Sequence, residues 1–230
     1  MIGTNLSFVL LLRDEYDGRV ILNGGQSFLV DGRPARPLQK REGYYVFTGL
    51  AGESFEVTVG GGRYQPVTAR VAPEPGRPVT VLRLQRRPGM FSDCGWLCGG
   101  GLPPETPLFA RLESSGLSFQ SAKLQDEVPL LGVQGYCYRS LSGLRLAVGE
   151  GRTLETFLIA GRRTDGVYAL ERPLSHKHGP GEPIVRVSYG VTDANGEYRL
   201  PVEPGAEITQ VEYSQGEGRP WGCSSVTARS

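Results

Sequence analysis

The only two histidines of the chain, His176 and His178, stand two residues apart in the stretch SHKHG. In an extended segment, residues i and i+2 face the same side, so the two imidazoles would lie one pleat apart. Imidazoles placed in this way can bind zinc or iron. One chain supplies only these two ligands, whereas a threefold assembly would supply six. We therefore treat His176 and His178 as candidate metal ligands. The alternative is a loop in which one histidine bonds the backbone.

The cysteines offer a second kind of chemistry. Cys94 and Cys98 form a C-x3-C pair, while Cys137 and Cys223 stand alone. A four-cysteine zinc site usually shows two close pairs. In a chain that stays in the cytoplasm, free thiols are the default. A zinc site, or one disulfide in an oxidising medium, remains as an alternative.

Three acids lie in or beside the stretch TDANGEYRLPVEPG (192–205): Asp193, Glu197 and Glu203. A paired-carboxylate hydrolase needs two carboxyl groups roughly 5–10 Å apart on one face of a cleft. Here Asp193 lies in a turn, where its side chain bonds the local backbone, and Glu197 faces outward on the following strand. Asn195-Gly196 predicts a two-residue type I′ turn with positive φ. We interpret the stretch as the corner of a β-sandwich. Because no catalytic fingerprint is present elsewhere, we expect neither enzymatic activity nor a cofactor.

Charge and hydropathy limit the partners. The chain has 230 residues, a formal net charge of +1 and charges of mixed sign, which disfavours nucleic acid. The apolar run FVLLL (8–12) is far shorter than the ~20 residues of a membrane span. No basic residue precedes it, as one would in a signal peptide. We expect no membrane association and cytoplasmic synthesis, with a place in a particle such as a virion or a tail-like structure.

The secondary structure that would position these candidate residues is predicted to consist of β-strands. The chain contains 33 glycines and 17 prolines, which separate short apolar runs, as is typical of all-β proteins. In SFEVTVG, Phe55, Val57 and Val59 alternate with polar residues, which is the period of a half-buried strand. The predicted fold class is all-β: two small antiparallel β-sandwiches with a small β-rich module between them or inserted.

The expected domains follow from the interruptions in this pattern. Residues 1–86 are predicted to form one sandwich, and residues 107–230 a second β region with a module at about 144–187. Residues 87–106 contain a run of three glycines and a Pro-Pro pair, and we interpret them as a linker or ordered loop. Large apolar groups without local structure to bury them indicate contacts with a partner. The candidates in this segment are Met90, Phe91, Trp96 and Leu97.

Two distant segments share a spacing. EGYYVFTGLAGESFEV and NGEYRLPVEPGAEITQ align Gly43 with Gly196, Tyr45 with Tyr198, and Gly52 with Gly205. The second segment resembles the carboxypeptidase regulatory-like (transthyretin-like) β-sandwich. The matching residues are Thr192, Asp193, Gly196, Tyr198, Leu200, Pro204 and Gly205. The first segment looks like a diverged member, with Gly43, Tyr45, Phe47 and Gly52. The resemblance implies accessory, non-catalytic sandwiches, with Tyr45 and Tyr198 at equivalent buried positions.

The middle segment, residues 144–187, resembles short β-modules of phage and phage-like tail proteins. The matching residues are Glu155, Ile159, Asp165, Gly166, Leu170, Pro173, Leu174, His176, His178, Gly181 and Val185. This resemblance implies a structural or adaptor subunit that contacts other protein subunits or further copies of itself. Such an assembly would be a phage tail or a tail-like contractile injection particle. The alternative is a carbohydrate-binding or adhesin-type module, with Tyr136, Tyr138 and Trp221 as stacking platforms.

Overall fold

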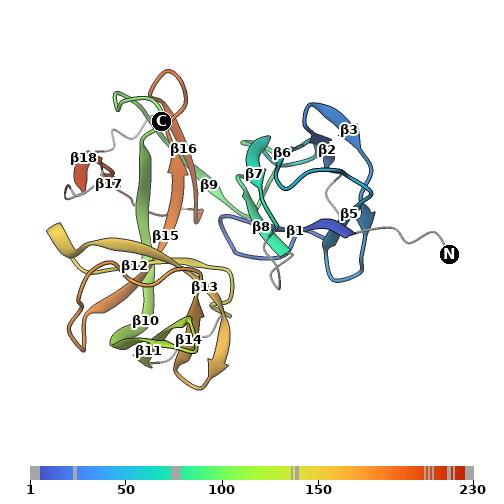
Figure 1. Cartoon of the computed structure of the whole chain (residues 1–230). Helices are drawn as coiled ribbons and strands as arrows, with labels where there is room; N and C mark the ends of the chain where they lie inside the picture. Colours follow the sequence, from blue (N-terminus) through green and yellow to red (C-terminus); the bar gives the residue numbers. More distant parts are fainter. Residues whose placement is uncertain are drawn as a thin grey trace. The chain divides into compact units, whose positions relative to one another are not determined.

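The fold was analysed in a computed structural model, which describes residues 6–22, 25–73, 79–135, 137, 140–204, 206, 208, 210–216, 219 and 221–225. The chain divides into two compact units. The first comprises Met1–Glu15 and Arg19–Phe91, and the second comprises Tyr16–Gly18 and Ser92–Ser230. Both units consist of β-strands, so the predicted all-β class is confirmed (Figure 1). Among the described residues, no helix is long and apolar enough to cross a membrane.

The first unit is a sandwich of two four-stranded sheets. One sheet has the order β4-β5-β1-β8 and the other the order β3-β2-β6-β7. The strands are β1 (Leu6–Asp14), β2 (Ser27–Val30), β3 (Arg33–Ala35), β4 (Leu38–Gln39), β5 (Tyr44–Thr48), β6 (Phe55–Gly60), β7 (Val67–Val71) and β8 (Val79–Leu84). β1 pairs with β8 in parallel, and the other pairs are antiparallel.

Alternating apolar residues from both sheets fill the core of this sandwich. Phe55, Val57 and Val59 of β6 are buried, as their period-two spacing predicted. Phe8 stacks on Phe47 with ring centroids 4.4 Å apart. The side chains of the two facing sheets therefore share one contiguous hydrophobic core.

A buried ion pair lies at the end of β1. Arg86 Nε is 2.8 Å from Asp14 Oδ2, and both side chains are at most 3% exposed. Tyr64 donates its hydroxyl proton to the same oxygen over 3.0 Å. The carboxylate thus has two donors in place of water, which offsets part of its cost of desolvation.

The second unit contains a closed ring of strands. Its strands are β9 (Gly95–Gly99), β10 (Pro107–Gln125), β11 (Val128–Gly135), β12 (Arg145–Val148), β13 (Glu155–Thr164), β14 (Val167–Leu170), β15 (Pro183–Val191), β16 (Tyr198–Val202), β17 (Gln210–Tyr213) and β18 (Gly222–Ser225). The order β11-β14-β13-β12-β15-β10 closes because β10 also pairs with β11. The result is a small antiparallel barrel whose interior side chains form a core of their own, including Phe119, Leu131, Leu146, Ile159 and Ile184.

Outside the barrel, the second unit has a further layer that includes the first part of β10, the end of β15, and β9, β16 and β17. β10 and β15 run side by side through the unit, and β10 also pairs with β17 (Figure 1). β9 and β16 form a two-stranded sheet, in which Leu97 pairs with Leu200 and Trp96 with Pro201. A small core of Leu108, Tyr198, Leu200 and Val211, with Leu97 against it, joins these strands.

This arrangement differs from the expected linker at residues 87–106. Residues 95–99 form a strand, and the boundary between the compact units falls at Phe91. The glycine-rich segment shows no alternation of apolar and polar residues, so the sequence did not predict this strand. Packing requires one of its glycines, Gly99. A Cβ at Gly99 would lie 2.3 Å from the hydroxyl oxygen of Tyr198, so only glycine lets the Tyr198 ring cross β9.

The turn before β16 does not have the type I′ geometry that the sequence predicted. Gly196 has φ +75°, but Asn195 is not among the residues of positive φ. Gly196 N donates to Asp193 O over 3.0 Å, and Asp193 N donates to Glu197 O over 2.8 Å. These bonds fit a type I turn followed by a left-handed glycine. Asp193 Oδ1 accepts from the N–H groups of Asn195 and Glu197, so this acid stabilises the turn, as expected.

The two tyrosines that the sequence comparison aligned are both buried, as predicted. Tyr45 and Tyr198 are each 5% exposed. Their surroundings differ, because β5 is an inner strand of a four-stranded sheet whereas β16 belongs to a two-stranded one. The two regions have different topologies, so the prediction that the tyrosines occupy equivalent positions of two similar sandwiches is wrong. The segments share only a local turn–strand arrangement with a buried tyrosine.

Mutations in the corner test its structural role. We expect Tyr198→Ala to lower the free energy of unfolding by about 3–5 kcal/mol, because a buried ring is lost. Gly196→Val is expected to be at least as damaging, since its Cβ would lie 2.0 Å from Leu102 O. Asp193→Ala should cost about 1 kcal/mol, and Glu197→Ala close to nothing. Urea denaturation gives the order directly. An acid variant more damaging than Tyr198→Ala would contradict the structural interpretation.

Candidate functional site

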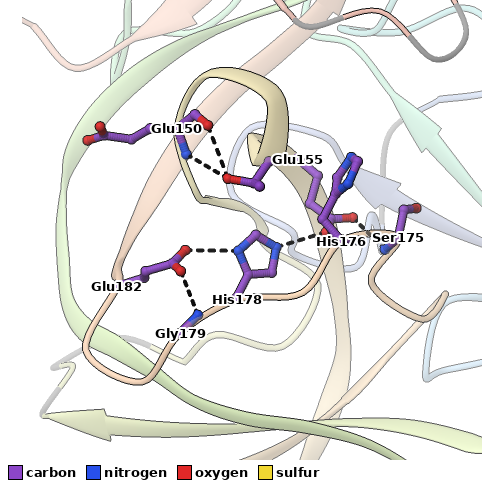
Figure 2. Close-up of polar contacts among 8 residues, drawn as sticks. Glu150, Glu155, Ser175, His176, His178, Gly179 and Glu182 are labelled. Carbon is purple, nitrogen blue, oxygen red and sulfur yellow. Dashed lines mark hydrogen bonds and ion pairs between the residues drawn. The ribbon is translucent and has the colours of Figure 1, made fainter.

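His178 is the centre of a polar network in the second unit. It lies in the connection between β14 and β15, and its side chain is 0% exposed. Its Nδ1 is 2.9 Å from Glu182 Oε2, and its Nε2 is 2.9 Å from Glu155 Oε1 (Figure 2). The ring also packs on Phe119, with centroids 5.6 Å apart. The imidazole thus joins the start of β13, at Glu155, to the residue just before β15, Glu182, and packs on the barrel core through Phe119.

The two carboxylates also hold the backbone of the connection. Glu155 accepts hydrogen bonds from the N–H groups of Ser175 and His176 over 2.8 and 2.9 Å. Glu182 accepts one from the N–H of Gly179. This backbone hydrogen bond, followed by the contact with His178, holds the pKa of Glu182 below its ordinary value of 4.5. Each ring nitrogen of His178 thus faces one carboxylate, and a nitrogen that carries a proton can donate it to the carboxylate beside it.

The histidines are not brought together as a pair of ligands. His176 contributes its main-chain N–H to Glu155, and its ring is separate from that of His178 (Figure 2). Among the described residues, no group of three or more His, Cys, Asp or Glu side chains could hold a metal ion. Metal binding by His176 and His178 stays a prediction. It would require His178 to exchange a carboxylate contact for the metal.

A groove of about 540 Å³ lies beside this network. One wall is the end of β10, from Phe119 to Leu124, and the other is the connection that carries Pro173, Leu174 and Lys177. Leu130 and Leu170 contribute to its lining. His178 is one of the residues that line the groove, so the network that anchors the connection also shapes one wall.

The predicted partner contacts divide between the two units. Met90 is 51% exposed, whereas Phe91 packs on the first core, edge-on to Tyr64 at 5.4 Å. The guanidinium groups of Arg63 and Arg86 lie 4.1 and 4.3 Å from the Phe91 ring centroid. Phe91 is therefore engaged within its own unit.

Trp96 and Leu97 lie on β9 in the second unit, where both are partly buried and Leu97 packs on the core around Tyr198. The four residues do not form one patch within either unit. Their role as partner contacts stays a prediction, and Met90 is the most exposed of them.

The remaining candidates are distributed as follows. Trp221 is half-buried and packs edge-on to Phe109 at 4.8 Å. Tyr136, Tyr138 and Gly205 lie outside the described residues. Glu203 pairs with Arg186 over 2.9 Å. The thiols of Cys98, Cys137 and Cys223 are free, and Cys94 is buried.

Sequence reasoning missed the partners of His178. Glu155 was noted for its spacing and Glu182 was not singled out, although Glu182 follows His178 by four residues. That proximity was the one available signal. Glu155 lies 23 residues earlier, and only the pairing of β13 within the barrel brings it to the ring.

Comparison with known proteins adds little to this description. No known family matches the chain, and no curated protein matches its sequence. Among solved structures, the chain is similar to the crystal structure of a DUF3823 family protein from Bacteroides ovatus ATCC 8483. The two are 8% identical over 96% of each chain, with a TM-score of 0.26. At that score the similarity supports no conclusion, so the all-β class rests on the strands described above.

Removing the His178 ring tests its role as an anchor. We expect His178→Ala to lower the free energy of unfolding by about 2–4 kcal/mol, because two carboxylates lose their shared donor and Phe119 loses its covering ring. His176→Ala is the matched control and should change stability by less than about 0.5 kcal/mol, as for an exposed side chain. Urea denaturation near pH 7 measures both. Equal effects of the two variants would show that the network does not stabilise the fold.

The pKa of Glu182 predicts a pH dependence. A carboxyl group whose folded pKa lies below its unfolded value of 4.5 stabilises the fold above that pH, and this stabilisation is lost as pH falls through the folded pKa. Glu182→Gln should therefore be less stable than the wild type near neutral pH, and the difference should shrink on acidification below about 4.5. Glu197→Gln, at an exposed position, serves as the control. A difference between Glu182→Gln and wild type that stays constant across this range would contradict the assignment.

Proposed function

We propose that the protein is a non-enzymatic structural or adaptor subunit that contacts other protein subunits of a larger assembly. The supporting observation is the outer face of the sheet β4-β5-β1-β8. There, side chains form an apolar row across all four strands: Leu38, Val46, Val9 and Val79. A second row follows with Tyr44, Leu11 and Val81. We call these two rows the apolar face.

The apolar face lies on the side of the sheet opposite the sandwich core. The core side of the same strands is formed by Phe8, Leu10 and Leu12, which alternate with Val9 and Leu11 along β1. Leu38 is 60% exposed, Val79 42% and Val81 37%, whereas Val9 and Leu11 on the central strand are only 9% and 8% exposed. Exposed apolar groups that adjoin one another mark interaction surfaces, because burying them against a partner removes apolar area from water.

The polar residues that the sequence offered as metal ligands or catalytic acids make structural contacts, which supports a non-enzymatic role. His178, Glu155 and Glu182 hold a connection in place, and Asp193 stabilises a turn. The assembly we have in view is a phage tail or a tail-like contractile injection particle, because residues 144–187 resemble β-modules of such tails. The chain would be made in the cytoplasm and incorporated into that particle.

Sedimentation of the tagged chain in extracts of cells that naturally make it tests the proposal. We expect the wild-type chain, of 24.9 kDa, to sediment with a much larger particle. Val81→Lys should return it to the monomer fraction, because it places a charge in the apolar face. Leu29→Lys is the matched control, since Leu29 is equally exposed, at 37%, on the outer side of the other sheet. A wild-type chain found only as monomer would refute the proposal.

A further inference from the structure

The end of β10 has one edge with which no other described strand pairs. β15 pairs with β10 only as far as Ser118, and the last main-chain bonds on that side join Phe119 to Gly181 and Glu182, each over 2.8 Å. From Ser121 to Gln125, β10 pairs with β11 alone among the described strands. The strand therefore continues for several residues with one side of its backbone open to a partner.

The hairpin turn shows which groups face this open side. Asp126 and Glu127 both have positive φ, at 49° and 62°, as in a two-residue type I′ turn. Such a turn makes Gln125 and Val128 a hydrogen-bonded pair, and bonded pairs then alternate along the ladder. The N–H and C=O groups of Leu124 and Ala122 consequently point away from β11. The partner of Leu124 is Pro129, which has no N–H to bond, in agreement with this assignment.

The groove described above runs along this open edge. Its far wall is the connection between β14 and β15, which His178 and its two carboxylates hold in one position. The groove is therefore largely formed before anything binds, which reduces the entropy lost on binding. Leu124, 68% exposed, and Leu174 give it apolar surface for alternate side chains of an added strand.

The charges of the groove select one kind of strand. Two lysines, Lys123 and Lys177, line it, and the described residues that line it include no Asp or Glu. The nearest carboxylates of the network, Glu155 and Glu182, are engaged by His178. A second copy of the same edge would bring a further Lys123 to a groove already lined by Lys123 and Lys177, and like charges across strands are unfavourable. An acidic strand would instead find complementary charge.

We infer that the open edge of β10 and its groove bind an extended segment of a partner protein, with alternating apolar and acidic side chains, by strand addition. This inference rests on the proposed function as a subunit that contacts other proteins. It adds the site, the mode of binding and the chemistry of the partner segment. Main-chain bonds to Ala122 and Leu124 would hold the segment, and Lys123 and Lys177 would select its acids.

Selection from a displayed library of random peptides tests the inference. Peptides of about nine residues are long enough to add one strand. We expect the immobilised full chain to enrich peptides in which apolar and acidic residues alternate. The most enriched peptide is then labelled, and its affinity for each variant is measured by fluorescence anisotropy.

Two variants separate backbone from charge recognition. Leu124→Pro removes an outward N–H without removing a bond to β11, and should weaken binding about tenfold relative to Leu124→Ala, the factor of one lost hydrogen bond. Lys177→Glu changes the other wall without touching the strand and should abolish the preference for acidic peptides. Circular dichroism and thermal midpoints confirm that each variant is folded.

The outcomes that overturn the inference are distinct. They are enrichment of no peptide, enrichment of peptides without acids, or equal binding by Leu124→Pro and Leu124→Ala. Binding of an acidic oligosaccharide in place of peptides would also overturn it. If the chain still sediments with a particle and Val81→Lys releases it, the proposed function stands while this inference fails.

Discussion

The barrel closes only because one long strand, β10, pairs with different strands along its two halves. Its 19 residues pair with β15 and β17 at the start and with β11 at the end. Register shifts occur between Arg111 and Leu117 on one side and between Phe119 and Ser121 on the other. Such irregularities bend a strand and increase its twist, which lets β10 pair with β15 and β17 at its start and with β11 in the barrel wall at its end.

The same constraint creates the open edge. Where β10 curves away from β15, the two strands lose contact, and the chain between β14 and β15 runs past the gap. This connection has no ladder of its own to fix it. Side chains fix it instead, because Glu155 and Glu182 bond both its backbone and His178. His178, which the sequence suggested as a metal ligand, joins the carboxylates of Glu155 and Glu182. These contacts hold the connection that forms one wall of the groove.

In the first unit, β1 has apolar residues on both of its faces. The run FVLLL sends Phe8, Leu10 and Leu12 into the sandwich core and Val9 and Leu11 to the outer side. A continuous apolar run is typical of a strand covered on both faces. The cross-strand neighbours of Val9 and Leu11 are apolar as well, and two of them, Val79 and Val81, are exposed. This is why the sheet offers an apolar face for a partner.

The sequence by itself determined which residues face a core and where the chain turns. The alternation of Phe55, Val57 and Val59, and the glycines before Tyr45 and Tyr198, predicted buried positions that the structure contains. Only the tertiary structure decided which strands pair. It placed β9 beside β16, closed the barrel through β10 and β11, and brought Glu155 to His178. Alternation reports the apolar face of a strand, but every strand presents the same main-chain donors and acceptors at its edges. The choice of neighbour, and the side-chain contacts that follow from it, therefore depends on packing across distant parts of the chain.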